Sequence, residues 1–402
     1  MSPPIRFGTD GVRGPVGTWP ITPAGAEAIG LGIATWARSG TVFIGQDTRE
    51  SGPELVEAMI RGLTQGGSTA VRLGVLPTAA VSAAVAADEA AIAGVMITAS
   101  HNPWADNGIK VLDAAGEKLL DPDPLLACLA APVAQGAGEA LDHPSPLSAW
   151  TSSLPQVDLS GRSILLDAAH GAGSVAALDA LEAAGARVRA VGVSPTGRNI
   201  NDGVGSMCPP TDLQGCDFAI CLDGDADRLV MVDPDHGVLD GDDLLWMLSQ
   251  AADGPIVGTV MSNGGLEEAL GGRLVRTDVG DAKVHAEMVR IGAQLGGEPS
   301  GHIMIHGGMP TSDGLYTALR VLQAAGSGPL PIGGWNRWPQ AKLNVRDVGL
   351  DPDLGAIQSA RGAGHRVLVR ASGTEPVVRV MVEGPDAEMW AEQIANELPP
   401  LA

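Results

Sequence analysis

The sequence predicts a mixed α/β protein made of three α/β units followed by a small α+β unit. Short apolar segments of strand length alternate with longer segments whose apolar residues recur at helical spacing. The 55 Gly and 29 Pro indicate many short connections, as alternating β and α elements need. Only 3% of the residues are aromatic while 45% are hydrophobic, so we expect cores packed from Ala, Val, Leu and Ile. A chain of 402 residues has room for about two to four domains.

The first unit is predicted over residues 1–150. Its elements alternate along the chain, with strands at 41–45, 71–73 and 92–97 and helices at 53–65 and 78–87. The last of these strands ends just before Ser100. Residues 132–150 are rich in Pro, Gly, Ala and Ser, which indicates a domain boundary.

The remaining units are predicted over residues 151–249, 250–337 and 338–402. Their strands are expected at 163–167, 187–193, 218–222, 256–261, 303–305, 366–370 and 377–383. Their helices are expected at 174–184, 265–270, 282–292, 313–325 and 386–398. The Gly- and Pro-rich residues 326–341 read as a linker before the small last unit.

Charge and cysteine usage exclude several classes of protein. The formal net charge is −22 at pH 7, which repels nucleic acid and anionic membranes, so we predict neither as a partner. No stretch of about 18 residues is continuously apolar, and we expect a soluble, cytoplasmic protein. The four cysteines lack metal-site spacing, so neither a disulfide framework nor a structural metal site is expected.

The first candidate for a reactive group is Ser100, within the run Thr-Ala-Ser-His-Asn-Pro at residues 98–103. The preceding strand would bring its hydroxyl to the carboxyl end of a sheet, where open α/β folds place their sites. With His101 beside it and the cationic Lys110 following, this oxygen could carry a phosphoryl group. The alternative is a serine in an ordinary Asn-Pro turn.

A candidate metal loop follows the strand at 218–222. Asp223, Asp225 and Asp227 alternate with Gly and Ala and precede Arg228, so three carboxylates could surround one hard divalent cation. Mg²⁺ fits, because few protein oxygens and a phosphate oxygen suit its octahedral preference. An EF-hand is excluded, because Pro234 stands where its twelfth-position Glu would be. The alternative is a solvated acidic turn.

A candidate phosphate loop lies near the C-terminus. Residues 370–379 place two hydroxyls and a Gly between Arg370 and Arg379, and a strand is predicted on each side. Hydroxyls, backbone N–H groups and guanidinium groups are the donors that a phosphate dianion needs. A plain hydrophilic hairpin is the alternative.

Three further segments carry weaker indications. Residues 297–302, Gly-Glu-Pro-Ser-Gly-His, could exchange hydrogen bonds with sugar hydroxyls through Glu298 and Ser300, or form an ordinary loop. Residues 6–14 read as a flexible Gly turn, whose spacing matches neither nucleotide-binding fingerprint. Residues 47–49, Asp-Thr-Arg, follow the first strand and could be only a helix cap.

Taken in this order, these segments resemble the α-D-phosphohexomutase superfamily over residues 7–383. Residues 7–14, 199–206, 297–302 and 379–384 are similar to its phosphoglucosamine mutase branch. The resemblance implies four domains around a central cleft, the first three of similar α/β topology. It implies an isomerase that interconverts glucosamine 6-phosphate and glucosamine 1-phosphate through a phosphoserine enzyme. The implied cofactors are Mg²⁺ and glucosamine 1,6-bisphosphate or another hexose 1,6-bisphosphate; the partner is a small sugar phosphate, and a homodimer stays open.

The site residues implied by the resemblance fall into four groups. The transferring phosphoryl group would be carried by Ser100 and flanked by acid/base or charge-stabilising groups, Arg13, His101 and Lys110. Mg²⁺ would be held by Ser100, Asp223, Asp225 and Asp227, with Arg228 beside them. The sugar would contact Glu298, Ser300 and His302. The phosphate that does not react would be held by Arg370, Ser372, Gly373, Thr374 and Arg379.

Three departures from the pattern of that branch concern the choice of sugar. Residues 206–209 read Ser-Met-Cys-Pro where Ser-Thr-His-Pro is expected, and residues 279–283 read Val-Gly-Asp-Ala-Lys where Val-Gly-Asp-Arg-Tyr is expected. Pro299 stands in place of Gln. A phosphomannomutase or phosphoglucomutase of the same superfamily therefore stays an alternative. A sugar-phosphate phosphatase and a non-catalytic phosphosugar-binding protein are further alternatives.

Overall fold

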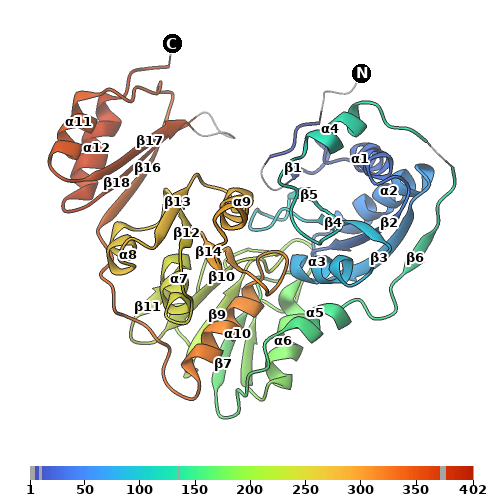
Figure 1. Cartoon of the computed structure of the whole chain (residues 1–402), viewed down its shortest axis with the longest axis horizontal. Helices are drawn as coiled ribbons and strands as arrows, with labels where there is room; N and C mark the ends of the chain where they lie inside the picture. Colours follow the sequence, from blue (N-terminus) through green and yellow to red (C-terminus); the bar gives the residue numbers. More distant parts are fainter. Residues whose placement is uncertain (1–4, 9–10, 135, 372–376, 402) are drawn as a thin grey trace. The chain divides into compact units, whose positions relative to one another are not determined.

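The computed structural model describes residues 5–8, 11–134, 136–371 and 377–401 (Figure 1). The chain divides into two compact units, the first from Met1–Thr259 with Thr277–Ile332 and the second from Val260–Arg276 with Gly333–Ala402. None of the helices within the described residues has the length and hydropathy of a membrane-spanning segment.

A six-stranded sheet begins the first unit. Its strands are β1 (Val12–Pro15), β2 (Thr41–Gln46), β3 (Thr69–Val75), β4 (Ala91–Ile97), β5 (Asp106–Leu112) and β6 (Ala140–Asp142). They lie in the order β1-β5-β4-β2-β3-β6, and β5 is antiparallel to both of its neighbours while β4, β2, β3 and β6 run parallel. The accompanying helices are α1 (Pro23–Trp36), α2 (Gly52–Gln65), α3 (Thr78–Ala86), α4 (Asp123–Ala130) and α5 (Ser148–Ser153).

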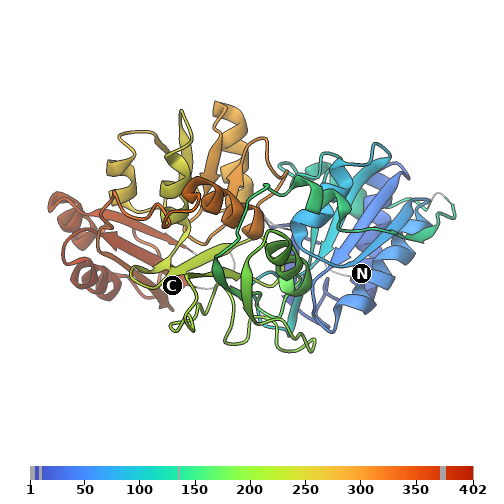
Figure 2. The same cartoon turned by 90° about the horizontal axis from the view of Figure 1, so that it is seen from below.

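Helices cover both faces of this sheet (Figures 1 and 2). α1 and α2 pack together on one face, over a core of aliphatic side chains that includes Ile44, Val95 and Ile97. Gly62 of α2 allows the close approach of α1, because a Cβ there would lie 2.0 Å from the Glu27 carbonyl oxygen. α3 packs against β2 and β4 on the opposite face. The aliphatic core is the one that the composition predicts.

The first unit contains two more sheets. One is formed by β7 (Ser163–Asp167), β8 (Arg187–Val191), β9 (Phe218–Leu222), β10 (Leu229–Asp233) and β11 (Gly237–Leu239), in the order β11-β10-β9-β7-β8. The other contains β12 (Ile256–Thr259), β14 (Leu295–Gly297) and β15 (Ile303–Ile305) as neighbours. The helices beside them are α6 (Gly173–Ala183), α7 (Gly241–Ser249), α9 (Asp281–Ile291) and α10 (Gly314–Ala325). The loops after β4, β9 and β14 carry most of the predicted site residues.

The second unit is a small α+β unit, as predicted. Its antiparallel sheet is formed by β16 (Gln340–Arg346), β17 (Arg366–Ala371) and β18 (Val377–Glu383), with β18 in the middle. α11 (Gly355–Gly362) and α12 (Ala387–Glu397) share its core with Val380 and Val382. α8 (Gly264–Ala269) and β13 (Leu274–Thr277) come from the earlier chain segment.

The structure confirms several predicted elements and corrects one. The strands predicted at 163–167, 218–222 and 377–383 have the same bounds in the structure. The segment at 6–14 was predicted as a flexible Gly turn, and this is wrong for residues 12–14. Together with Pro15 they form β1, because the neighbouring β5 offers its backbone groups to an antiparallel ladder. The bounds of the four predicted domains stay a prediction.

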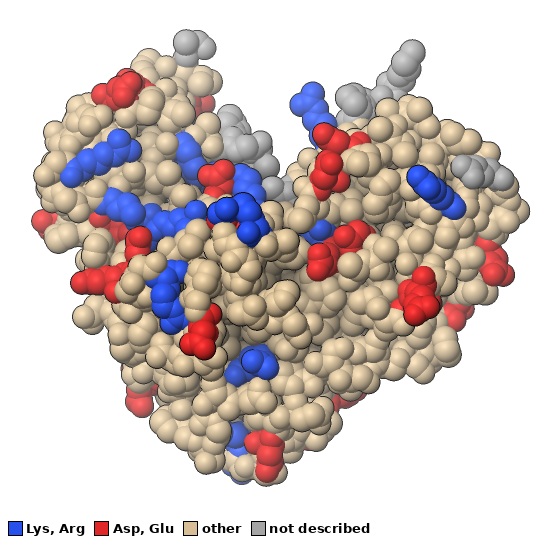
Figure 3. All heavy atoms as spheres, viewed as in Figure 1, with Lys and Arg blue, Asp and Glu red and all other residues tan. Residues whose placement is uncertain are grey.

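Charged side chains are distributed differently on the surface and in the interior. On the face drawn in Figure 3, acidic and basic side chains lie scattered among a larger uncharged area. Charged residues are also buried, among them Lys110, Asp223, Asp225 and Asp227, each at most 4% exposed. Because isolated buried charges are costly, such a group indicates a site that binds or transfers charge.

Candidate active site

The Ser100 loop leaves the carboxyl end of β4, as the sequence predicts. Ser100 is 2% exposed and has a positive φ of 53°, a left-handed conformation that non-Gly residues seldom adopt. Its backbone N–H donates a 2.9 Å hydrogen bond to the Thr98 hydroxyl. The backbone therefore holds the Ser100 side chain in an orientation that an ordinary extended loop would not give.

The buried side chain of Arg49 binds the backbone of this loop. Its side chain is fully buried and pairs with Asp47, with 2.9 Å between Nε and Oδ2. Its guanidinium donates hydrogen bonds to four carbonyl oxygens of the loop, those of Ser100 (3.0 Å), Asn102 (2.8 Å), Pro103 and Asp106 (2.9 Å). The sequence showed this Asp-Thr-Arg run after a strand, but a helix cap was an equally good interpretation.

A second loop also contacts the carbonyl groups next to the serine. The Asn201 amide donates hydrogen bonds of 2.9 Å to the Ser100 carbonyl and 3.1 Å to the Asn102 carbonyl. Asn201 itself has a positive φ of 60°. It lies in the 199–206 run that resembles the phosphoglucosamine mutase branch, but no role was predicted for it.

The three predicted metal-binding aspartates lie together beside Ser100. Asp223, Asp225 and Asp227 are fully buried, and each offers an oxygen within 4.8 Å of the others. The Ser100 hydroxyl donates a 2.7 Å hydrogen bond to Asp223 Oδ2. Burial, and then the negative charges of Asp227 and Asp225, raise the pKa of Asp223 to about 7.

This donor set fits a hard divalent cation. Asp225 Oδ1 is buried and has no hydrogen-bond partner among the described residues, although a buried carboxylate oxygen is normally paired. Clustered carboxylates repel one another unless a cation lies between them, and oxygen ligands are those that Mg²⁺ prefers. The residues present therefore suit Mg²⁺, whereas a solvated acidic turn would not be buried.

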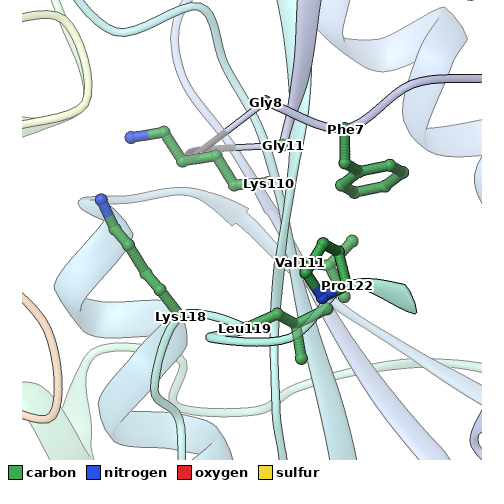
Figure 4. Close-up of a pocket in the computed structure, with 8 residues that line it drawn as sticks. All are labelled: Phe7, Gly8, Gly11, Lys110, Val111, Lys118, Leu119 and Pro122. Carbon is green, nitrogen blue, oxygen red and sulfur yellow. The ribbon is translucent and has the colours of Figure 1, made fainter. Parts of the chain in front are cut away.

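Two lysines bring positive charge to the same cluster. Lys110 Nζ lies 2.8 Å from Asp225 Oδ2 and 2.7 Å from Asp227 Oδ2, and Lys118 Nζ lies 3.7 Å from Asp227 Oδ2. Both lysines line one small cavity of about 20 Å³. In Figure 4 their ammonium ends point away from Phe7. Lys110 was predicted, whereas Lys118 was not.

A neutral histidine and an arginine also lie near the Ser100 hydroxyl. His101 Nδ1 lies 3.4 Å from Ser100 Oγ, and burial together with the charges of Arg228 and Arg13 lowers the pKa of His101 to about 3. Arg228 Nε lies 3.8 Å from Asp223 Oδ2, and its backbone N–H donates to Asp223 Oδ1 at 3.2 Å. Such an environment favours an anion over a further cation next to the serine.

The predicted sugar loop between β14 and β15 reaches the metal loop. His302 Nε2 lies 3.0 Å from Asp227 Oδ1, and His302 Nδ1 lies 3.3 Å from Glu298 Oε2. Burial lowers the pKa of His302, but the charge and hydrogen bond of Asp227, together with the hydrogen bond to Glu298, raise it to about 9. Ser300 Oγ is 3.5 Å from Glu298 Oε2. The loop is thus linked to the aspartates through one histidine.

The predicted phosphate residues belong to the second unit. Arg370 and Arg379 are direct partners across the β17–β18 ladder. Like charges opposite each other on a sheet repel, so a bound anion would stabilise this pair. Ser372, Gly373 and Thr374 lie outside the described residues.

Comparisons with known proteins give the family. The phosphoglucomutase/phosphomannomutase family models match three regions: alpha/beta/alpha domain I at residues 4–125, alpha/beta/alpha domain III at 240–331 and the C-terminal domain at 352–398. A phosphoglucosamine mutase from Aeromonas hydrophila is 38% identical over an alignment of 441 positions, gaps included, which covers 98% of this chain and 98% of that protein.

Solved structures show the same fold. A phosphoglucomutase/phosphomannomutase family protein from Burkholderia thailandensis has a TM-score of 0.79 and 22% identity, covering 97% of this chain and 98% of that chain. An N-acetylphosphoglucosamine mutase from Aspergillus fumigatus, in complex with GlcNAc-6P and magnesium, has a TM-score of 0.69 and 18% identity, covering 98% of this chain and 95% of that chain. The domain models and the nearly full-length identity together show that the chain belongs to the α-D-phosphohexomutase superfamily and, within it, to the phosphoglucosamine mutase family.

Proposed function

We propose that this protein is a phosphoglucosamine mutase, an isomerase that interconverts glucosamine 6-phosphate and glucosamine 1-phosphate. The observation that carries the proposal is the buried Ser100 hydroxyl. It donates a 2.7 Å hydrogen bond to Asp223 Oδ2, and Asp223 belongs to a cluster of three buried aspartates. The 38% identity to a phosphoglucosamine mutase over almost the whole chain supports the choice of sugar.

The reaction proceeds by two phosphoryl transfers through Ser100. In the first, the bond between phosphorus and Ser100 Oγ breaks as a bond forms to the sugar O1 oxygen, giving a bound 1,6-bisphosphate. The sugar O1 loses its proton as the new bond forms, and the departing Ser100 Oγ gains a proton, so that the serine hydroxyl is restored. His101, whose Nδ1 lies 3.4 Å from Ser100 Oγ, is placed to relay this proton. The bisphosphate then turns over, and its 6-phosphoryl group returns to Ser100. A hexose 1,6-bisphosphate would therefore restore a dephosphorylated enzyme.

Asp223, Asp225 and Asp227, with an oxygen on Ser100, are the residues that would hold Mg²⁺. When bound, Mg²⁺ would supply positive charge against the oxygens of the transferring phosphoryl group, the main need of this chemistry. Lys110 and Arg228 contribute further positive charge from the protein itself. The magnesium in the Aspergillus fumigatus relative supports this choice of metal.

The remaining substrate-binding residues have the roles that the resemblance implies. Glu298, Ser300 and His302 contact the sugar hydroxyls. Arg370 and Arg379, together with Ser372, Gly373 and Thr374, hold the phosphate that does not react. Arg13 and His101 would flank the transferring phosphoryl group. The positive charge of Arg13 contributes to the lowered pKa of His101.

Proton and phosphorus NMR of the purified protein tests the proposal. The protein is incubated with Mg²⁺, a trace of hexose 1,6-bisphosphate and, side by side, the 6-phosphates of glucosamine, glucose and mannose. We expect the glucosamine phosphate to be converted with a kcat/KM at least about tenfold above the others. A preference for mannose or glucose would overturn the choice of sugar, and steady release of inorganic phosphate would indicate a phosphatase. Calorimetric binding without conversion would indicate a binding protein.

A further inference from the structure

A closed ring of polar contacts joins the sugar loop at residues 297–302 to the metal loop at residues 223–228. All its members belong to the first unit. Lys118 pairs with Asp281, whose chain neighbour Gly280 donates to Glu298. Glu298 contacts His302, which contacts Asp227, and Asp227 lies near Lys118 again. Its charged side chains are each at most 7% exposed. Buried charges depend on their partners, so a change at one member should be felt by the others.

Lys118 is the member of the ring whose role the proposed reaction does not explain. It follows β5, and its ammonium group forms a close ion pair with Asp281 Oδ2 at the start of α9. Its distance to Asp227 Oδ2 is 3.7 Å, which is longer than a hydrogen bond. Lys118 thus makes its closest contact with Asp281, and its charge also acts on Asp227 of the metal loop.

Asp281 in turn fixes the backbone that holds Glu298. The residue before it, Gly280, has a φ of 128°, a conformation open to Gly but strained for other residues. The Gly280 N–H donates a 2.9 Å hydrogen bond to Glu298 Oε1. Because the direction of this N–H depends on where α9 starts, the Lys118–Asp281 pair sets the orientation of the Glu298 carboxylate.

We propose that Lys118 and Asp281 are positioning residues for sugar recognition, whose buried ion pair orients the Gly280 N–H and through it the Glu298 carboxylate. The inference rests on the proposed function, in which Glu298 contacts the sugar. It adds a pair of residues that do not touch the substrate themselves. The pair acts on binding of the sugar more than on the transfer of the phosphoryl group.

Lys118→Met and Asp281→Asn test the inference. Each variant should raise the KM for the sugar phosphate about tenfold, as loss of a supporting residue around a site commonly does, while kcat stays within about threefold. Because both residues act through one contact, the double variant should show about the same tenfold rise and not a hundredfold one. In a Ser100→Ala background, calorimetric titration with glucosamine 6-phosphate should show the same loss of affinity without any turnover.

Arg290→Met is the matched control. Arg290 lies on the same helix, α9, and also pairs with a carboxylate, with 2.6 Å between its Nη2 and Glu287 Oε1, but its side chain is 68% exposed. This variant should leave KM, kcat and sugar affinity unchanged. An effect in this control equal to that of Lys118→Met would overturn the inference.

Two other outcomes would also overturn it. Lys118→Met could lower the melting temperature with no change in KM for the folded enzyme, which would show a structural role alone. It could raise the Mg²⁺ concentration for half-maximal activity with no change in sugar KM, which would place its action on Asp227. If Lys118→Met fails to fold, Asp281→Asn and the double variant, which leaves neither charge of the pair buried, carry the same test.

Failure of the proposed function is distinguishable from failure of this inference. A wild-type enzyme that prefers another hexose phosphate overturns the choice of sugar, and the KM effect is then measured on that hexose. A wild-type enzyme that isomerises glucosamine phosphate, with unchanged KM in Lys118→Met and Asp281→Asn, overturns only the positioning role.

Discussion

The Ser100 hydroxyl donates a 2.7 Å hydrogen bond to Asp223 Oδ2, although 123 positions separate the two residues in the chain. Ser100 follows β4 of one sheet and Asp223 follows β9 of another. The meeting of these strand ends places an oxygen that could carry a phosphoryl group next to oxygens that could hold a metal ion. Phosphoryl transfer needs both, because it depends on positioning and on charge stabilisation.

Replacing Ser100 should abolish the isomerisation. Ser100→Ala removes the oxygen that carries the phosphoryl group, so we expect activity to fall by at least about a thousandfold. Mass spectrometry of the wild-type protein should find phosphate on the peptide that contains Ser100. Ser152→Ala, at an exposed serine on α5, is the control and should retain full activity. Full activity in Ser100→Ala would contradict the proposed mechanism.

Removal of divalent ions should stop the reaction, and Mg²⁺ should restore it. Asp225→Asn takes away a buried carboxylate whose Oδ1 has no partner among the described residues. We expect it to raise the Mg²⁺ concentration for half-maximal activity at least about tenfold. Calorimetric Mg²⁺ titration should show the same weakening, and Mg²⁺ should raise the melting temperature of the wild type because it binds the folded state.

Asp235→Asn is the control for the metal prediction, since Asp235 is exposed in the turn between β10 and β11. This variant should keep the wild-type Mg²⁺ dependence. Isomerisation that continues unchanged in excess chelator would contradict a metal role for the aspartate cluster.

The elements that the sequence predicts best are those with one clear physical signal. The strand at 218–222 is a run of five apolar or small residues between polar ones, and all five are buried in the structure. α1, at residues 23–36, had no predicted counterpart. Its Ala- and Gly-rich sequence lacks a continuous polar face, so the usual periodicity of a surface helix is weak.

The candidate site was predictable where neighbouring residues carry the chemistry, and not where the fold brings distant residues together. Ser100 and the aspartates stand out because reactive groups follow short apolar strands. Arg49 and Thr78 do not, because their partners are distant in the chain; the Thr78 hydroxyl donates a 2.6 Å hydrogen bond to Asp225 Oδ2, 147 positions away. Lys118 likewise meets Asp281 only after the sheets have packed. A single sequence contains no signal for such contacts.

Removing the Arg49 side chain should destabilise the first unit and reduce activity. Arg49→Met removes one donor from each of four carbonyl groups of the Ser100 loop and removes the positive charge beside the buried carboxylate of Asp47. The Asn201 amide still donates to the Ser100 and Asn102 carbonyls, and the Thr98 hydroxyl still donates to Asp47. Breaking a buried ion pair from one side costs about 3–5 kcal/mol, so the urea midpoint of the first unit should fall accordingly. Proteolysis within the loop at residues 100–106 should become faster.

Arg61→Met is the matched control for Arg49→Met. Arg61 also pairs with a carboxylate, Glu27, at 3.1 Å, but both side chains are largely exposed. An exposed pair contributes less than about 1 kcal/mol, so this variant should unfold at nearly the wild-type urea concentration. Equal effects of Arg49→Met and Arg61→Met would show that the loop does not depend on the buried guanidinium.

Asp313 should make stability depend on pH in a predictable direction. Burial raises the pKa of Asp313 to about 6, although hydrogen bonds from the Trp150 indole (2.6 Å) and the Tyr316 N–H (3.0 Å) act in the opposite sense. Between about pH 4 and pH 6 the folded state then binds this proton more tightly than the unfolded chain, so the contribution of Asp313 to stability falls as pH rises. Asp313→Asn removes the charge and with it this pH dependence. As pH rises from 4 to 7, the free energy of unfolding of Asp313→Asn should therefore increase relative to that of the wild type, by up to about 3 kcal/mol.

Urea unfolding of both proteins at several pH values measures this difference. Asp158→Asn is the control of opposite sign, because the Ser160 hydroxyl and backbone N–H lower the pKa of the exposed Asp158. Its ionised form stabilises the folded state above the unfolded pKa, and this contribution is lost as pH falls. Relative to wild type, Asp158→Asn should therefore become slightly less stable as pH rises from 3 to 6, whereas Asp313→Asn becomes more stable. If Asp313→Asn instead becomes less stable relative to wild type as pH rises, the Trp150 and Tyr316 donors stabilise the Asp313 carboxylate more strongly than burial disfavours it, and the prediction is wrong.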